Sequence, residues 1–259
     1  MAQYVCIGVP YWLGESKAER TEVDAIKNSG IADELGAAWV DIQPDFDAVD
    51  HPVVAVNRAI ADAIQAHSDK TPLVFASDCT SCMGMVKGLE SYAPAILWYD
   101  SHGDFNTPET SESGFLGGMP LAALVGRGNE HLMQGVELEP IAESDVYVTD
   151  VRNLDREEGD MMRNSDVTIF GQVSDLLTAS LPDKPIYLHF DTDVVDSSEM
   201  PAMNYPEPNG PSLAETGATL KHVVDHHQVV GVLFSLWNDT LAGAEQAKEA
   251  TLELVRQLK

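Results

Sequence analysis

The chain of 259 residues carries 42 acidic and 15 basic side chains, which gives a formal net charge of −27, and 44% of its residues are hydrophobic. It is long enough to bury a large core. The acidic excess disfavours nucleic acid and anionic membranes as partners, because phosphate binding needs clustered Lys and Arg. No apolar stretch approaches the ~20 residues that span a bilayer.

The N-terminal text MAQYVCIGVP has no basic n-region and no small-residue cleavage site, so it is typical of a first strand rather than a signal peptide. We therefore expect a cytoplasmic protein. The cysteines are Cys6, Cys79 and Cys82, and this low, odd count argues against a secreted disulfide scaffold.

Apolar runs and segments with helical spacing alternate along the chain. In chain order, the predicted strands are Tyr4–Pro10, Ala38–Ile42, Leu73–Ala76, Ala95–Tyr99, Val146–Val148, Val167–Phe170, Ile186–Phe190 and Val229–Phe234. The predicted helices are Ala55–Ala66, Met83–Tyr92, Leu213–His226 and Ala242–Leu258. Continuously apolar strands are typical of a parallel sheet buried on both faces. The alternation predicts an α/β fold with a doubly wound sheet, and the absence of a linker predicts a single domain over residues 1–259.

Three predicted strands end in residues that carry chemistry, and in such sheets the ligand site lies at the carboxyl ends of the strands. The three segments are Ser77-Asp78-Cys79-Thr80, Asp100-Ser101-His102-Gly103-Asp104 and Asp191-Thr192-Asp193. Side chains two residues apart point the same way on an extended chain, so Asp100, His102 and Asp104 can converge. So can Asp191 and Asp193.

Packed carboxylates repel one another, and bound cations resolve that conflict. Carboxylates with one imidazole suit Mn²⁺ better than a structural zinc. Two metal ions about 3.5–4 Å apart would generate a hydroxide nucleophile. The plain alternative is that these aspartates are turn residues at strand ends, where Asp is common; two such segments in this order, with a His between two Asp, favour the metal site.

These segments closely resemble the ureohydrolase family, which comprises arginase, agmatinase and formiminoglutamase. That family has a GGDH turn, a DAHxDxNTP segment that leads to SGxxHGxP, and an SxDxDxxDPxxxP segment. Here the corresponding text is Ala76-Ser77-Asp78-Cys79, then DSHGDFNTPETSESGFLGGMP, then HFDTDVVDSSEMPA. The cysteine in the turn and the FNTPET text most resemble a divergent branch that hydrolyses hydroxyarginine.

The resemblance implies a three-layer α/β/α sandwich with a mostly parallel sheet of about eight strands, assembled in trimers or hexamers. It also implies a binuclear manganese site and water attack on a guanidinium carbon, which releases urea or an analogue. The implied metal ligands are Cys79, Asp100, His102, Asp104, Asp191 and Asp193, with Asp104 and Asp193 as catalytic residues. Asn106, Ser113 and Asp155 match residues that hold the amino-acid head of the substrate.

Three positions depart from the family pattern. Cys79 replaces a histidine ligand, and it is either a soft metal ligand, one half of a redox CxxC pair with Cys82, or a buried small hydrophobe. Gly117 replaces a histidine associated with proton transfer. Leu236 replaces a glutamate that binds the substrate guanidinium, or Ser235 does so if the alignment is moved by one residue. Neither residue is anionic. This predicts a substrate whose side chain ends in a group less basic than guanidinium, such as a hydroxyguanidine.

Three functions remain open from the sequence. The first is an amidinohydrolase that acts on an arginine-like small molecule to give urea or hydroxyurea. The second is a catalytically impaired member that binds metal and an amino-acid-like ligand. The third is a redox sensor in which Cys79 and Cys82 gate metal binding.

Overall fold

The computed structural model describes residues 4–259, and its centre is one parallel sheet of eight strands in the order β2-β1-β3-β8-β7-β4-β5-β6. The strands are β1 (Tyr4–Val9), β2 (Ala38–Asp41), β3 (Thr71–Ala76), β4 (Ala95–Tyr99), β5 (Val146–Thr149), β6 (Thr168–Phe170), β7 (Ile186–Asp191) and β8 (Val229–Ser235). Each predicted strand is present with ends that agree within two residues. Because every strand pair is parallel, all carboxyl ends lie at one edge of the sheet.

Helices fill the connections between the strands. Their bounds are α1 (Glu22–Lys27), α2 (Ile31–Leu35), α3 (Pro52–Ala66), α4 (Cys82–Gly88), α5 (Pro120–Leu124), α6 (Glu130–Val136), α7 (Arg156–Arg163), α8 (Leu213–His226) and α9 (Ala244–Arg256). The four predicted helices correspond to α3, α4, α8 and α9, although α4 stops at Gly88 and a 3₁₀ turn covers Glu90–Tyr92. The other five have five to eight residues, which is too short for a clear 3.6-residue hydrophobic period.

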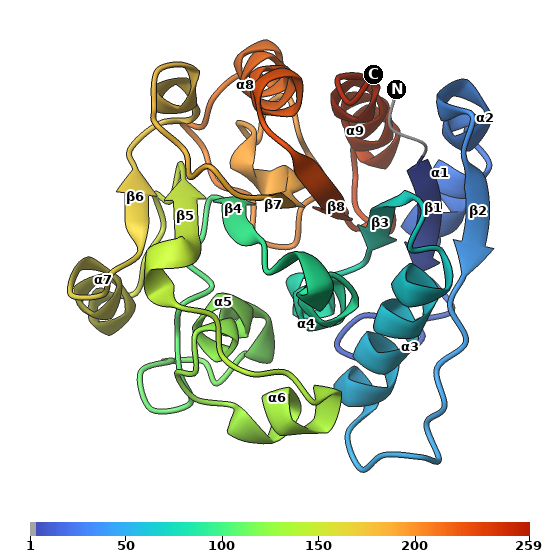
Figure 1. The fold of residues 1–259 in the computed structure, drawn as a ribbon. Coiled ribbons are helices and arrows are strands. Elements are labelled where there is room, and N and C mark those ends of the chain that lie inside the picture. Colours follow the sequence, from blue (N-terminus) through green and yellow to red (C-terminus); the bar gives the residue numbers. More distant parts are fainter. Residues whose placement is uncertain (1–3) are drawn as a thin grey trace.

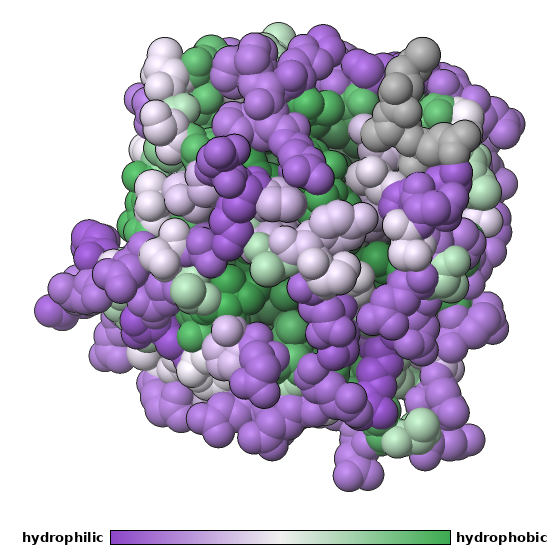
Figure 2. Space-filling view, in the orientation of Figure 1, coloured by the Kyte–Doolittle hydropathy of each residue, from purple (hydrophilic) through white to green (hydrophobic). Residues whose placement is uncertain are grey.

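Helices cover both faces of the sheet (Figure 1). One core packs strand residues such as Ile7 and Trp98 against α3, α4, α5 and α6, and the other packs their chain neighbours Cys6 and Leu97 against α1, α8 and α9. This follows from the two-residue period of a strand, which sends successive side chains to opposite faces. The result is the expected α/β/α sandwich, and hydrophilic side chains cover much of its outer surface (Figure 2).

A close contact between α3 and α4 fixes the helix that follows the Cys79 turn. A Cβ at Gly84 would lie 2.5 Å from the carbonyl oxygen of Asn57, so only glycine permits this approach. The buried Asn57 side chain accepts a hydrogen bond from the Gly84 amide at 2.5 Å and donates to the Val53 carbonyl at 2.9 Å. The start of α4 is therefore held rigidly against the longer helix.

The central strands β3, β8, β7 and β4 are adjacent in the sheet although they are far apart in sequence. Their ends lie in register, since Ala76 and Asp191 both pair with Ser235, and Tyr99 pairs with Phe190. The segments after these strands therefore meet at one place. Within residues 4–259, no helix combines the length and apolarity needed to cross a bilayer.

Candidate metal and substrate site

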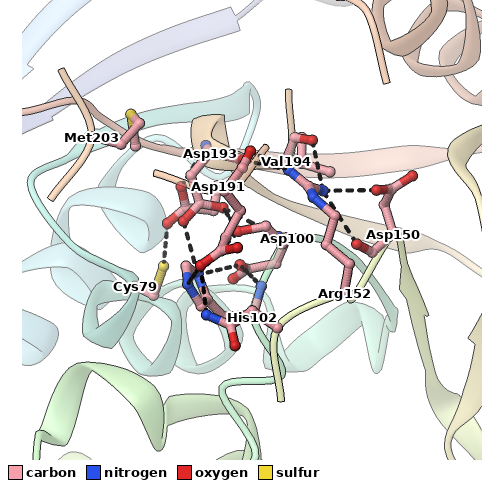
Figure 3. A network of polar contacts seen from close by, with 12 residues as sticks. Cys79, Asp100, His102, Asp150, Arg152, Asp191, Asp193, Val194 and Met203 are labelled. Atoms are coloured by element: carbon pink, nitrogen blue, oxygen red, sulfur yellow. Dashed lines mark hydrogen bonds and ion pairs between the residues drawn. The ribbon is translucent and has the colours of Figure 1, made fainter. Parts of the chain in front are cut away.

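The three acidic segments converge at the carboxyl edge of the sheet, as Figure 3 shows for Cys79, Asp100, His102, Asp191 and Asp193. Every carboxylate of this group is at least nine-tenths buried, and Asp100 is only 1% exposed. The structure thus brings these side chains together at one place. The rest of their geometry comes from the turns that carry them.

Cys79 begins the 3₁₀ turn after β3, and its Sγ lies 3.0 Å from Oδ2 of Asp191 at the end of β7. Asp78 caps this turn by accepting a hydrogen bond from the Thr80 amide at 2.8 Å. Its other oxygen accepts from the Leu13 amide at 2.5 Å. Asp78 therefore ties the turn to the loop after β1, and Cys79 is the residue of the turn that faces the aspartates.

His102 and Asp193 form the second contact of the cluster. Nδ1 of His102 lies 2.9 Å from Oδ2 of Asp193, and 3.5 Å from Oδ1 of Asp100. Oδ1 of Asp193 accepts from the Ser101 hydroxyl at 2.8 Å and from the Ser101 amide at 3.1 Å. Asp100 accepts from the indole of Trp98 at 3.0 Å. These donors orient each carboxylate toward the centre of the group.

Asp104 differs from its neighbours because one of its oxygens has no partner. Its backbone lies in the left-handed region at φ 48°, and its carbonyl accepts from the amides of Leu121 and Ala122 at the start of α5. Its buried Oδ2 accepts no hydrogen bond within residues 4–259. A buried carboxylate oxygen without a partner is costly, so this atom points to a ligand that the cluster binds.

The pKa values reflect crowded, buried acids. Burial, together with the charge of Asp193, raises the pKa of Asp100 to about 6. Burial and the neighbouring carboxylates also hold the pKa values of Asp104 and Asp191 well above their ordinary range. Burial opposes protonation of His102, but Asp100 and Asp193 overcome it and raise the His102 pKa to about 12. Such a group binds protons when no cation is present to balance it.

The donor atoms fall into two groups that share Asp100. In one, Cys79, Asp100 and Asp104 each offer an atom within 4.8 Å of the others; in the second, Asp100, His102 and Asp193 do so. Asp191 contacts the first group through Cys79. Two adjacent donor sets with one carboxylate in common are suited to two divalent cations.

The cluster lies in a cavity of about 470 Å³, which Asn106, Ser113 and Asp155 also line. Asn106 is buried and donates a hydrogen bond to Oδ2 of Asp155 at 3.0 Å. Ser113 is exposed, and its hydroxyl accepts from the Phe115 amide at 3.2 Å. The structure therefore brings all three predicted substrate residues to the pocket that holds the acidic cluster.

The two missing family side chains also fall on this cavity, since Gly117, Ser235 and Leu236 line it. A Cβ at Gly117 would lie 2.3 Å from Cε1 of Phe115, so the phenyl ring occupies the space that a longer side chain would need. Neither Ser235 nor Leu236 brings a charge. At both positions the cavity wall therefore lacks the polar side chains, a histidine and a glutamate, of the ureohydrolase segments.

Sequence reasoning missed several residues of the cavity. Glu158 is buried and accepts hydrogen bonds from the amides of Phe105 (2.9 Å) and Asp155 (3.1 Å). The Asp-x-x-Glu spacing of Asp155 and Glu158, a capping box at the start of α7, was a signal that could have revealed it. Glu207, Trp12 and Tyr205 gave no such signal, because loops that are distant in sequence bring them to the cavity.

The buried thiols do not have the environment of a redox pair. Burial, then the charges of nearby aspartates, raises the pKa values of both Cys79 and Cys82 well above the ordinary thiol value. Reactive CxxC pairs need a lowered thiol pKa and access to solvent, so the geometry does not favour the redox interpretation. His189 is fully buried and stacks on Trp98 with ring centroids 3.4 Å apart.

Comparison with known proteins identifies the fold and the family. The sequence model described as the Arginase family matches residues 19–258. The chain belongs to the arginase family. This result confirms the resemblance to ureohydrolases that the strand-end segments indicated.

Relatives within the arginase family are distant in sequence but extensive in coverage. An arginase of Bacillus caldovelox is 27% identical over 293 residues, which covers 97% of this chain and 96% of that protein. The N(omega)-hydroxy-L-arginine amidinohydrolase of Streptomyces lavendulae is 29% identical over 210 residues, which covers 78% of this chain and 74% of that protein. The solved arginase of Bacillus subtilis has the same fold, with a TM-score of 0.88, 24% identity, and coverage of 100% of this chain and 98% of that one. The chain is thus an arginase-family hydrolase, consistent with cleavage of a carbon–nitrogen bond.

Proposed function

We propose that this single-domain protein is a binuclear, metal-dependent amidinohydrolase that cleaves a C–N bond of an arginine-like guanidino or hydroxyguanidino compound to give urea or hydroxyurea. Manganese is the proposed metal. Cys79, Asp100, His102, Asp104, Asp191 and Asp193 are the proposed ligands. The observation that carries the proposal is the pair of adjacent donor groups that share Asp100.

The donor chemistry fits such a centre. The unpartnered Oδ2 of Asp104 faces a group of carboxylates that are otherwise too close to be ionised together. Carboxylate and imidazole donors suit Mn²⁺, whereas the Cys79 thiol gives one donor group a softer character that also suits zinc or iron. When bound, the metal pair would supply Lewis acidity. It would also lower the pKa of bound water, so that hydroxide is available at neutral pH.

The chain's own side chains bind and orient the substrate in this proposal. Asn106, Ser113 and Asp155 hold the amino-acid head, with Asp155 facing the α-ammonium group. The hydrogen bond between Asn106 and Asp155 supports this role because it fixes both side chains on the same wall of the cavity. Within the described residues, no Lys or Arg lines the cavity, which favours a substrate that carries positive charge.

Asp104 and Asp193 are the proposed catalytic residues, because both line the cavity that Asn106 and Asp155 also line. Asp193 is held ionised: burial alone would raise its pKa, but His102 and Ser101 keep it below its ordinary value. Asp104 contributes the buried Oδ2 that has no hydrogen-bond partner within residues 4–259. The ring of Phe115 lies against Gly117 and occupies the space beside it.

The test is the metal content of protein purified without chelator, measured by mass spectrometry, with assays for urea and hydroxyurea from arginine, hydroxyarginine and agmatine. We expect about two manganese ions per chain, as a two-metal site requires, and turnover of hydroxyarginine or a related compound. Absence of metal after reconstitution with manganese would contradict the proposal.

A second candidate is a family member that binds metal and an amino-acid-like ligand without turnover. Gly117 and the uncharged pair Ser235 and Leu236 favour it, because the side chains associated with proton transfer and guanidinium binding are missing. Two metal ions with no turnover of any guanidino compound would select this candidate. We further propose that the protein is cytoplasmic and that it forms a homo-oligomer, either a trimer or a hexamer. Analytical ultracentrifugation measures the oligomeric state directly.

A further inference from the structure

We propose that Glu207 is a positioning residue for His102: its carboxylate accepts the hydrogen on Nε2 and keeps Nδ1 available for a metal ion. The inference rests on the proposed metal centre and deepens it, because it concerns how one ligand is oriented. It depends on the contacts of the His102 ring and on the way the Glu207 loop is anchored.

The two nitrogens of His102 face different surroundings. Nδ1 points into the cluster, 2.9 Å from Oδ2 of Asp193, whereas Nε2 points outward, with Oε1 of Glu207 at 3.9 Å. A neutral imidazole carries one hydrogen. If Nδ1 gives its lone pair to a metal, that hydrogen must be on Nε2, and it needs an acceptor on the outer side of the ring.

Glu207 is the acidic side chain that the structure places at that position. Ligand histidines almost always donate their second N–H to a carboxylate, a carbonyl or water, which fixes the tautomer and the ring orientation. The gap of 3.9 Å exceeds a hydrogen bond by about 1 Å, and the end of a half-buried glutamate side chain can move that far. The His102 ring also lies edge-on to the ring of Tyr205, with centroids 6.3 Å apart.

Hydrogen bonds of one arginine connect the loop that carries Glu207 to the acidic cluster. The guanidinium of Arg152 donates to the carbonyls of Glu207 and Asp193, both at 3.2 Å. Figure 3 shows Arg152 beside the cluster, with Asp150 on its far side. Gly210 permits this approach, because a Cβ there would lie 2.6 Å from Nη2 of Arg152. One side chain thus sets the distance between the Glu207 backbone and the cluster.

The Glu207 carboxylate is itself oriented. Asn153 donates to its Oε1 at 2.6 Å, and the backbone of Asn153 pairs with that of His102. Asn153 therefore links the Glu207 carboxylate to the backbone segment that carries His102.

The experiment measures Mn²⁺ affinity of metal-stripped protein by isothermal titration calorimetry, with circular dichroism to confirm folding. We expect Glu207→Gln to weaken binding by about 10- to 100-fold, the usual effect of removing such a partner, and Glu207→Asp to restore part of it. Glu112→Gln is the matched control, since Glu112 is an exposed acid on a cavity loop but does not line the cavity. It should bind like the wild type.

A double-mutant cycle with His102→Ala separates positioning from plain negative charge. If Glu207 acts through the imidazole, Glu207→Gln has little further effect in the His102→Ala protein, a coupling expected only of residues that act together. Equal losses in both backgrounds, or unchanged affinity of Glu207→Gln in the wild-type background, would overturn the inference and leave the proposed function intact. A wild-type protein that binds no Mn²⁺ would overturn both.

Discussion

The inner wall of the cavity and its outer rim are built in different ways. The inner wall (Cys79, Asp100, Asp104, Asp191 and Asp193) is buried and lies in the turns directly after sheet strands. The outer rim (Trp12, Ser113, Phe115, Tyr205 and Glu207) lies in loops between the elements, and Tyr205 is 53% exposed. The inner wall matches the ureohydrolase segments except at Cys79, whereas the rim carries aromatic rings and the carboxylate of Glu207.

This difference indicates that the inner wall binds the metal ions, whereas the rim selects the ligand. Strand ends hold donor atoms at fixed positions, because a parallel sheet aligns them in register. Loops on a rigid scaffold can change with little effect on the fold. A change at an aspartate of the inner wall should therefore abolish metal binding, whereas a change in the rim should alter affinity or substrate choice.

The largest expected effect comes from Asp100→Asn or Asp191→Asn. Each change removes a charge from the inner wall at nearly constant volume. Metal and activity should disappear together, with affinity reduced more than about 100-fold, since even residues that only support a ligand contribute 10- to 100-fold. Metal analysis and a urea assay measure this. Asp62→Asn, at an exposed position on α3, is the control; retained turnover in either cluster variant would contradict the ligand assignment.

Cys79 should affect one metal ion rather than both. Its thiol belongs to the donor group with Asp104 but not to the group with His102. Cys79→Ser should therefore lose about one equivalent of manganese of the two that the site would hold, while Cys79→His should keep or improve loading. Cys6→Ser, a buried thiol away from the cavity, should load like the wild type. Unchanged loading in Cys79→Ser would show that the thiol is not a ligand.

The stability of metal-free protein should depend on pH in the direction opposite to that of most acid-rich proteins. Asp100 has its pKa raised to about 6, and His102 to about 12, so the folded state binds more protons than the unfolded chain. The stability from these groups is present at low pH and is lost as the pH rises through about 6 and above.

Thermal unfolding of the stripped protein between pH 5 and pH 8 measures this effect. The melting temperature should fall as the pH rises, and manganese should reverse the trend because it replaces the protons. Metal affinity should correspondingly weaken below about pH 6. A stripped protein that becomes more stable from pH 5 to pH 8 would show that the inner wall is not packed with protonated acids.

The smallest effect concerns the rim. Gly117→His forces the imidazole against the ring of Phe115, so the single variant should lose about 1–3 kcal/mol of stability through overpacking. Adding Phe115→Ala should restore most of that loss and allow the histidine to enter the cavity. Chemical denaturation measures the stabilities, and comparison of arginine with hydroxyarginine in the double variant shows whether the rim selects the substrate. Equal stability of Gly117→His and wild type would indicate that the phenyl ring is free to move.

Much of the fold followed from local patterns. The eight apolar runs predicted the eight strands, and the central ones are continuously hydrophobic because they are buried on both faces. The long helices α3, α8 and α9 have several turns and could be predicted. The short helices α1, α2, α5, α6 and α7 have one or two turns, and tertiary packing rather than a sequence period stabilises them.

The sequence by itself determined the inner wall of this site. The D-x-H-x-D and D-T-D segments follow apolar strands, and parallel strands end at the same edge, so the inner-wall residues Asp100, Asp104, Asp191 and Asp193 were expected at that edge, together with His102. Only the tertiary structure decided the rim. Phe115 over Gly117, and Glu207 facing His102, depend on loop conformations set by long-range contacts such as those of Arg152 with Asp193 and Glu207. No local pattern encodes such contacts, because their energy appears only after the sheet has brought the loops together.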